Sequence, residues 1–529
     1  MNNNQYTYNQ PPMEQGMPPQ MGPARPRGWR DRWMHRFGMD ALMPLQRGAL
    51  TIPAWITGKS IAFFFVAMFA CWLFFGYVPE MNLWLAACVS IVLFFYGGDA
   101  MAKSWAKSKP KSFARRIYIA GLVARLAWVL YCVCFFNPDH YGNTFGDEAD
   151  TSWYMPYGMA IADWIKNGFN KSFSELMDEW ASGMDDTGYP MWLGIGYVIW
   201  GEWSDAVMPM IVKCIVGAYC AVCIYHVAQR HFGEGAARMA AIFVALNPNM
   251  IYWCGNMFKE AEMLFFVCLA VDNLDRVLTS GNKFTFKTLL PGILSALALM
   301  FFRTALGLVM FMAVFAHVVM ASQRVMSMGK KIIAGLLVFA ALAISMGEQI
   351  RVQSEHLIST AQSDAVQKEI ELRGTYKNAS GRSQSFAKYA TSAIFAPLIF
   401  TIPFPTFNVA HEGQLLHIQL SGGNYIKNIL SFFVLIVMIM MLISGEWRRH
   451  VFILAYTLGY LVVLVMSAFA QSGRFHMPIW PMLMLFAAYG IQIAKTNARV
   501  RKWFPIVLVI EVVACIAWNW FKLKGRGMI

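Results

Sequence analysis

A short acidic stretch, followed closely by aromatic residues, carries the side chains best suited to chemistry. Asp147, Glu148 and Asp150 stand within four positions, and Tyr154 is one of three aromatic residues that follow. One carboxylate can remove the proton of an attacking hydroxyl, its neighbours can hydrogen-bond sugar hydroxyls or hold a cation, and an aromatic face can stack on a sugar ring. Asp147 or Glu148 is therefore the candidate base, and Asp150 and Tyr154 are candidate substrate contacts. Alternatively, the acids only solvate a loop and cap a helix that begins near Thr151.

Charged residues also interrupt apolar runs farther along the chain. Lys259 and Glu260 stand at the end of one run, Arg303 breaks another, and Arg474 and His476 lie in a polar turn before a third. Ionisable residues at such depth in a membrane are costly and mark either a site or a structural ion pair, for example between Arg303 and Glu260. As a site, the cations suit a phosphate carried on a lipid, whose charge they would stabilise as it departs. Arg474 and His476 are otherwise an ordinary polar turn.

The composition indicates a membrane protein. Hydrophobic residues make up 57% of the 529 residues, charged residues only 14%, and the mean hydropathy is +0.44. Apolar runs long enough to cross about 30 Å of hydrocarbon recur along the chain, which predicts an all-α polytopic protein with about thirteen transmembrane helices. The net charge of +14 lies in short loops between these runs, which is typical of membrane topology and lipid contact rather than nucleic-acid binding.

The alternation of apolar and polar segments divides the chain into five regions. They are a disordered tail with a basic interfacial segment (1–58), an N-terminal transmembrane hairpin (59–100), a core (117–347) with an acidic outer loop (137–189), a second outer loop (348–426) and C-terminal spans (427–529). Three prolines near the end of the second loop indicate an interfacial or re-entrant hairpin rather than a straight helix. The expected spans lie near 60–78, 81–98, 117–136, 206–228, 238–254, 260–277, 288–302, 304–321, 332–347, 427–443, 451–470, 477–494 and 504–521.

Basic residues set the expected orientation of these spans. By the positive-inside rule, the amino terminus and the loop from Lys103 to Arg116 lie inside, so both large loops lie outside. The apolar segment from Met191 to Gly201 is too short for a comfortable crossing. We therefore expect it to dip into the outer face as a half-span.

Four motifs in this order resemble the GT-C superfamily of membrane glycosyltransferases, which includes protein O-mannosyltransferases and aminoarabinose transferases. They are Phe145-Gly146-Asp147-Glu148-Ala149-Asp150, Gly188-Tyr189-Pro190, Ala245-Leu246-Asn247-Pro248 leading to Lys259-Glu260, and Gly473-Arg474-Phe475-His476-Met477-Pro478. The resemblance covers about 117–495 and implies a GT-C-like bundle with two large extracytoplasmic loops. It further implies a polyprenyl-phosphate-linked sugar donor, Asp147 or Glu148 as the base, and inversion at the anomeric carbon.

The resemblance has two departures, and other functions remain as alternatives. Two extra spans precede the one that matches the family's first, and Lys259-Glu260 stands where a lone Asp is expected. A polysaccharide polymerase or lipid-linked-glycan ligase would also have many spans and outer cations, whereas a flippase or transporter would carry charges in mid-span and related halves. The acceptor, whether lipid, glycan or protein, is left open, and so is a divalent metal such as Mg²⁺. The expected location is a bacterial inner membrane, with the site on the periplasmic face.

Overall fold

The structure is a computed structural model that describes residues 51–75, 81–136, 148–172, 175–176, 186–201, 207–279, 286–320, 417–466 and 474–525. Within these ranges every regular element is a helix. Four helical segments are long and apolar enough to cross a membrane, namely Pro110–Cys134, Val207–Leu246, Gly423–Ser444 and Met477–Lys495. The expectation of an all-α polytopic membrane protein is therefore confirmed. The amino-terminal tail, the expected span 332–347 and most of the second outer loop lie outside the described residues.

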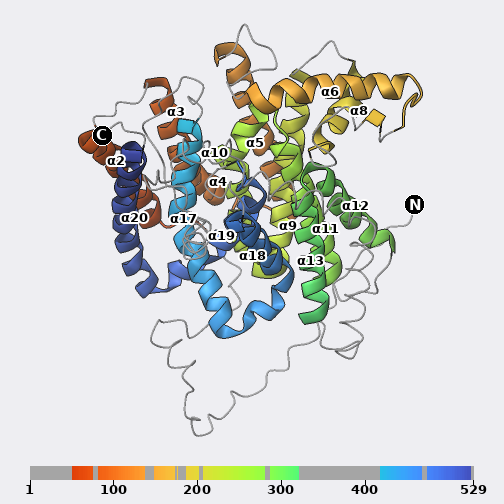
Figure 1. Ribbon diagram of the computed structural model, residues 1–529. Helices are drawn as coiled ribbons and strands as arrows, with labels where there is room; N and C mark the ends of the chain where they lie inside the picture. The colour runs from red at the N-terminus through yellow and green to blue at the C-terminus, as the bar shows by residue number, and fades with distance from the viewer. Residues whose placement is uncertain are drawn as a thin grey trace, which may run out of the picture.

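Four α-helices precede the acidic loop in the described part of the chain. They are α2 (Ala54–Phe75), α3 (Met81–Val92), α4 (Gly98–Ser104) and α5 (Pro110–Tyr131). Helix α5 begins with proline, which suits the first helical position because no intrahelical partner is lost there. Helix α2 packs against α20 (Ala498–Gly525), and Figure 1 shows the two side by side at one edge of the bundle.

Helix α9 (Val207–Leu246) folds back on itself at Gly233. Gly233 has φ 80° and ψ 176°, a conformation that residues with side chains rarely adopt. Ala218 and Ala245, on opposite sides of this glycine, both lie next to Gly121 of α5, so the two halves of α9 run alongside each other. The second half ends at Leu246, earlier than the expected span 238–254, because Asn247 caps a new short helix, α10 (Pro248–Tyr252).

Two further helices lie across one end of the bundle. Helix α6 (Glu148–Lys166) runs crosswise to the long helices and packs on α8 (Gly188–Trp200), as Figure 1 shows. Glycines allow this close packing, since a Cβ on Gly158 would lie 2.8 Å from the Cβ of Leu193. With 13 residues, α8 is about 20 Å long, shorter than the hydrocarbon core of a bilayer.

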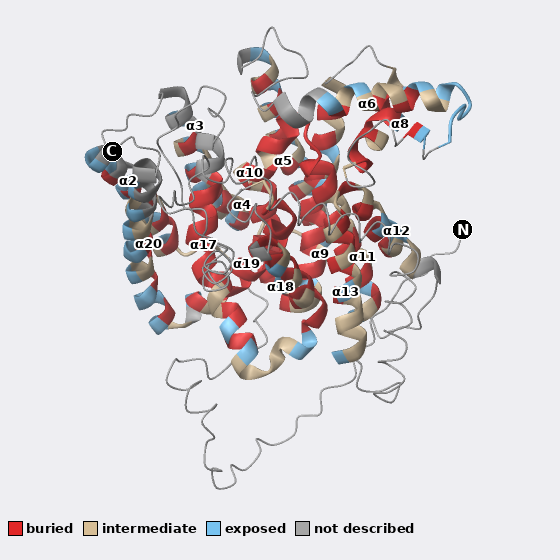
Figure 2. Cartoon of the chain, in the orientation of Figure 1, coloured by how far each residue is buried: buried red, intermediate tan, exposed pale blue. Residues whose placement is uncertain are grey.

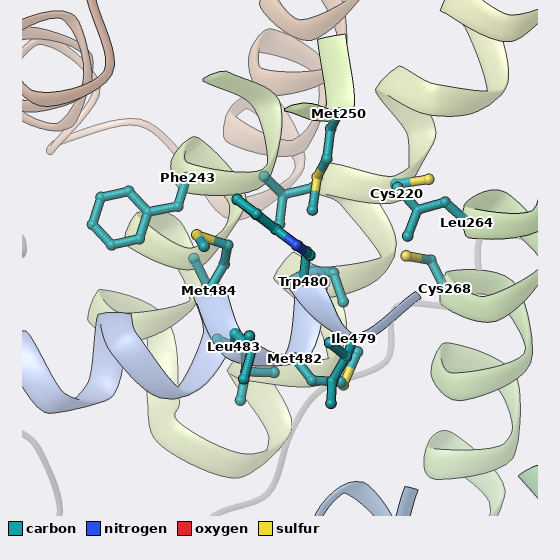
Figure 3. Close-up of a cluster of buried hydrophobic side chains, with 14 of the residues drawn as sticks. Cys220, Phe243, Met250, Leu264, Cys268, Ile479, Trp480, Met482, Leu483 and Met484 are labelled. Atoms are coloured by element: carbon teal, nitrogen blue, oxygen red, sulfur yellow. The ribbon is translucent and has the colours of Figure 1, made fainter. Parts of the chain in front are cut away.

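The remaining helices complete the bundle around α19. They are α11 (Glu260–Thr279), α12 (Phe286–Phe302), α13 (Thr304–Met320), α17 (His417–Ser444), α18 (Val451–Met466) and α19 (Trp480–Thr496). Helix α19 is buried between α9 and α17, and Figure 2 shows the buried residues concentrated there. Figure 3 shows Trp480 of α19 among residues of the same apolar core, including Met250 of α10 and Leu264 of α11. This core fixes the first turn of α11, where the charged residues gather.

Candidate functional site

Charged side chains gather where α11 begins. Lys259 directly precedes the helix, and Glu260 and Glu262 lie in its first turn, where carboxylates are favoured by the helix dipole. All three side chains are buried. Other polar side chains contact these three residues or lie next to residues that do. We call the whole group the first-turn cluster; its members are Lys259, Glu260, Glu262, Asp186, Lys213, Arg303, Lys427, Arg474 and His476.

Lys259 joins three parts of the chain. Its ammonium group forms an ion pair with Asp186, which lies just before α8. The same group donates a hydrogen bond to the carbonyl of Phe302, the last residue of α12, at 3.1 Å. Lys259 therefore holds the end of the acidic loop and the end of α12 against the start of α11.

Glu260 pairs with Arg474, which is 214 residues away in sequence. The Arg474 guanidinium also lies over the ring of Phe258, 4.4 Å from its centroid. The ion pair predicted as an alternative, between Glu260 and Arg303, does not form. The second carboxylate oxygen of Glu260 has no hydrogen-bond partner among the described residues. Because an unmatched buried acceptor costs about 1–3 kcal/mol, this oxygen marks a place where a ligand hydroxyl or water would be favourable.

Arg303, in the turn between α12 and α13, has a different environment. Its guanidinium lies 4.2 Å from the ring centroid of Phe475 and donates to the hydroxyl of Tyr460 at 3.4 Å. No carboxylate contacts it among the residues that the structure describes. Arg303 thus differs from Lys259 and Arg474, whose charges are already balanced by carboxylates.

A second buried ion pair, between Lys213 and Glu262, lies beside the ring of Tyr189. Lys213 of α9 lies 3.0 Å from Glu262 and 4.4 Å from the ring centroid of Tyr189. Tyr154 of α6 meets Tyr189 edge-on, with centroids 5.0 Å apart, and is itself buried. The structure therefore places Tyr154, a candidate substrate contact, in packing behind Tyr189. Sequence reasoning missed Lys213, although a lysine within an apolar run was a usable signal.

His476 is buried beside a lysine. Its Nδ1 lies 3.3 Å from the Nζ of Lys427, which is also buried. Lys427 was missed because it stands at the very start of an expected span, where lysines commonly reach back to the membrane surface. Counted over its described side chains, the first-turn cluster has five Lys or Arg residues and three carboxylates. The Lys and Arg residues outnumber the carboxylates, which suits a phosphate group.

Residues 179–348 of the chain, about a third of its length, match the Alg9-like mannosyltransferase family, which is of the GT-C type. This match supports the resemblance to GT-C-type membrane glycosyltransferases. The matched segment includes Asp186 and the start of α11 with Lys259 and Glu260, and it extends through Arg303. Among curated proteins, none matches the chain significantly.

The second half of the acidic motif, Glu148 to Asp150, forms the start of α6. The helix begins at Glu148, three residues earlier than expected, and also contains Asp150 in its first turn. Asp147 lies outside the described residues, and the side chains of Glu148 and Asp150 are not described. Across the part of the chain that the structure describes, no three His, Cys, Asp or Glu side chains are placed to hold a metal ion.

A second polar cluster lies at the other end of α11. Asp275 accepts hydrogen bonds from Arg230 at 2.6 Å and from His231 at 2.7 Å. His231 also meets His450, with Nδ1 atoms 2.7 Å apart, and Asp272 contacts Arg230 and His226. We call these six residues the last-turn cluster. Burial and the neighbouring His231 lower the pKa of His450, in the turn between α17 and α18, to about 3.

Proposed function

We propose that this glycosyltransferase moves a sugar, mannose according to its family match, from a polyprenyl-phosphate-linked donor to an extracytoplasmic acceptor with inversion. The observation that carries the proposal is the first-turn cluster, in which carboxylates and an excess of cations meet at one end of the bundle. Such a site can hold a lipid phosphate and a sugar at once, because cations pair with the phosphate while carboxylates accept hydrogen bonds from sugar hydroxyls.

The donor phosphate is proposed to bind at the cationic patch around Lys259, Arg303 and Arg474, with Arg303 as the residue that contacts it directly. Lys259 and Arg474 already pair with Asp186 and Glu260, so their charges are largely balanced within the protein. Arg303 presents a planar guanidinium that is held by Phe475 and contacts no carboxylate among the described residues. This arrangement lets Arg303 bind two phosphate oxygens as charge develops on the leaving group.

The base is proposed to be Asp147, or else Glu148, at the start of α6. Helix α6 packs on α8, and α8 follows directly after Asp186, so the acidic motif and the first-turn cluster are carried by adjacent elements. A carboxylate there would remove the proton of the acceptor hydroxyl as it attacks the anomeric carbon. Glu260 is less suited to this role, because its side chain is fully buried and paired with Arg474.

The site is proposed to face the periplasm of a bacterial inner membrane. Lys259 contacts the carbonyl of Phe302, the residue before Arg303, so Lys259 and Arg303 stand at the same end of the bundle. By the positive-inside rule this end is opposite the basic loops and therefore outside. Single cysteines at Ser174 and Ser363 should react with an impermeant thiol reagent in intact cells, in a variant without other reactive cysteines. Protection of both would contradict the orientation.

A lipid-linked sugar assay tests the proposed reaction. Purified protein is incubated with a panel of polyprenyl-phosphate sugars and with membranes as the source of acceptor, and released polyprenyl phosphate is measured. We expect release from the mannose-bearing donor, in amounts equal to the mannose that becomes attached to acceptor. Release from no donor in the panel, with protein that is folded by thermal unfolding, would contradict the proposal.

A further inference from the structure

Asp186 is unusual among the carboxylates of the first-turn cluster. Its side chain is 41% exposed, whereas the side chains of Glu260 and Glu262 are 0% exposed. Its backbone has φ 69°, in the left-handed region that few residues other than glycine adopt, although Asp and Asn tolerate it best. Such conformations persist where the surrounding structure holds them and are common at functional sites. Asp186 is therefore held in place while it remains accessible.

Lys259 helps to fix the position of Asp186. The buried ammonium of Lys259 pairs with Asp186 and is itself fixed by the carbonyl of Phe302. The chain after Asp186 is pressed against the same helix end, because a Cβ on Gly188 would lie 2.9 Å from the backbone nitrogen of Phe302. Arg303 follows Phe302 directly. The contacts of Lys259 and Gly188 with Phe302 therefore set the positions of both Asp186 and Arg303.

We propose that Asp186 is a further substrate-contacting residue, which accepts hydrogen bonds from the sugar hydroxyls of the lipid-linked donor, and that Lys259 is its positioning residue. This inference rests on the proposed function. In a polyprenyl-phosphate sugar, the sugar is attached directly to the phosphate. A phosphate bound at Arg303 therefore places the sugar near Asp186. An ionised carboxylate is a strong acceptor for hydroxyl groups, and its pairing with Lys259 limits repulsion from the donor phosphate.

Equilibrium binding of two ligands separates a sugar contact from a phosphate contact. The ligands are polyprenyl-phosphate-linked mannose and bare polyprenyl phosphate, and the variant is Asp186→Asn, which keeps the shape and tolerates the left-handed backbone. We expect Asp186→Asn to weaken binding of the mannose-bearing donor about tenfold or more and to leave binding of polyprenyl phosphate unchanged. Asp163→Asn, which alters an exposed carboxylate of α6, is the matched control and should bind both ligands as wild type does.

Lys259→Met tests the positioning role. Like Asp186→Asn, it should weaken binding of the mannose-bearing donor and not of bare polyprenyl phosphate. The double variant should lose little more affinity than either single variant, because both changes break the same ion pair. Weaker binding of bare polyprenyl phosphate by Lys259→Met would instead make Lys259 a phosphate ligand and overturn its positioning role.

The outcomes also separate this inference from the proposed function. If wild-type protein binds the donor and Asp186→Asn binds both ligands equally well, Asp186 does not contact the sugar, and the proposed function stands. If Asp186→Asn weakens both ligands alike, the contact is not with the sugar, and the inference fails in the same way. If the wild-type protein binds neither ligand, both the proposed function and the inference are wrong.

Discussion

The two ends of α11 carry polar clusters that use the same kinds of side chain. The clusters differ in whether their carboxylate oxygens all have hydrogen-bond partners. In the last-turn cluster, all four carboxylate oxygens of Asp272 and Asp275 contact Arg230, His226 or His231. In the first-turn cluster, Glu260 and Glu262 each keep one oxygen without a hydrogen-bond partner among the described residues. A polar network whose groups are all matched stabilises a fold, whereas unmatched buried groups indicate that something else binds there. This difference supports a structural role for the last-turn cluster and the proposed substrate site at the first-turn cluster.

The largest expected effect concerns the acidic motif beside the first-turn cluster. Asp147→Asn keeps the shape and removes the charge, so turnover should fall by about 10²- to 10⁴-fold while donor binding and the unfolding temperature barely change. The measurement is the initial rate of polyprenyl phosphate release at saturating donor. If Asp147 only caps α6, turnover stays near wild type and local stability falls by at most about 1 kcal/mol. Wild-type turnover in both Asp147→Asn and Glu148→Gln would remove this motif from the mechanism.

The last-turn cluster should respond in the opposite way. Asp275→Asn removes the carboxylate that pairs with His231 and one of the two that pair with Arg230, which should destabilise the protein by about 3 kcal/mol. Thermal unfolding in detergent measures this loss, and the donor affinity of the protein that remains folded should match wild type. A large loss of affinity in well-folded Asp275→Asn protein would show that the two ends of α11 are not separate in function.

Arg303→Ala should weaken donor binding about tenfold to a hundredfold, which corresponds to the loss of charge-assisted hydrogen bonds to phosphate. Stability should change little, because Arg303 is only partly buried and makes one long hydrogen bond. Equilibrium binding of polyprenyl phosphate is the measurement, with Arg276→Ala as the control, since Arg276 is an exposed arginine near the other end of α11. Unchanged affinity in Arg303→Ala would assign Arg303 to structure.

The smallest expected effect is a pH dependence of stability that arises from His450. Its pKa is about 3 in the folded protein and near 6.5, the usual value for histidine, in the unfolded chain, so the unfolded chain binds the proton first as the pH falls. Stability should therefore decrease below about pH 6.5, by about 2 kcal/mol at pH 5. Unfolding temperatures of wild type and His450→Gln between pH 7.5 and 5 measure this. Equal slopes for the two proteins would exclude His450 as the source.

The sequence was sufficient for the helical architecture and for much of the candidate site. Apolar runs reported the helices because a bilayer requires every backbone polar group to be paired within the segment. Lys259, Glu260, Arg303 and Arg474 were found because charges in apolar runs are rare and costly. The structure then placed them together around one end of α11.

The pairing of these charges could not be predicted from the sequence. Arg303 and Arg474 look alike as cations at span ends, yet only Arg474 meets Glu260, because that choice depends on how α11 and α18 pack. Asp186 was one of ten acids in the outer loop, and nothing in its spacing indicated the ion pair with Lys259. The break at Asn247 was also missed, since an apolar run continues past the residue that ends the helix.

Photo-crosslinking with a donor analogue tests whether the substrate binds at the start of α11. Polyprenyl-phosphate-linked mannose with a photoreactive group next to the phosphate is bound to wild-type protein, irradiated, and the modified peptides are mapped by mass spectrometry. We expect modification around Phe302 to Thr304 and around Arg474 to Met477, suppressed by excess unlabelled donor. Modification that unlabelled donor suppresses around Arg230 or His450 instead would show that the donor does not bind at the first-turn cluster.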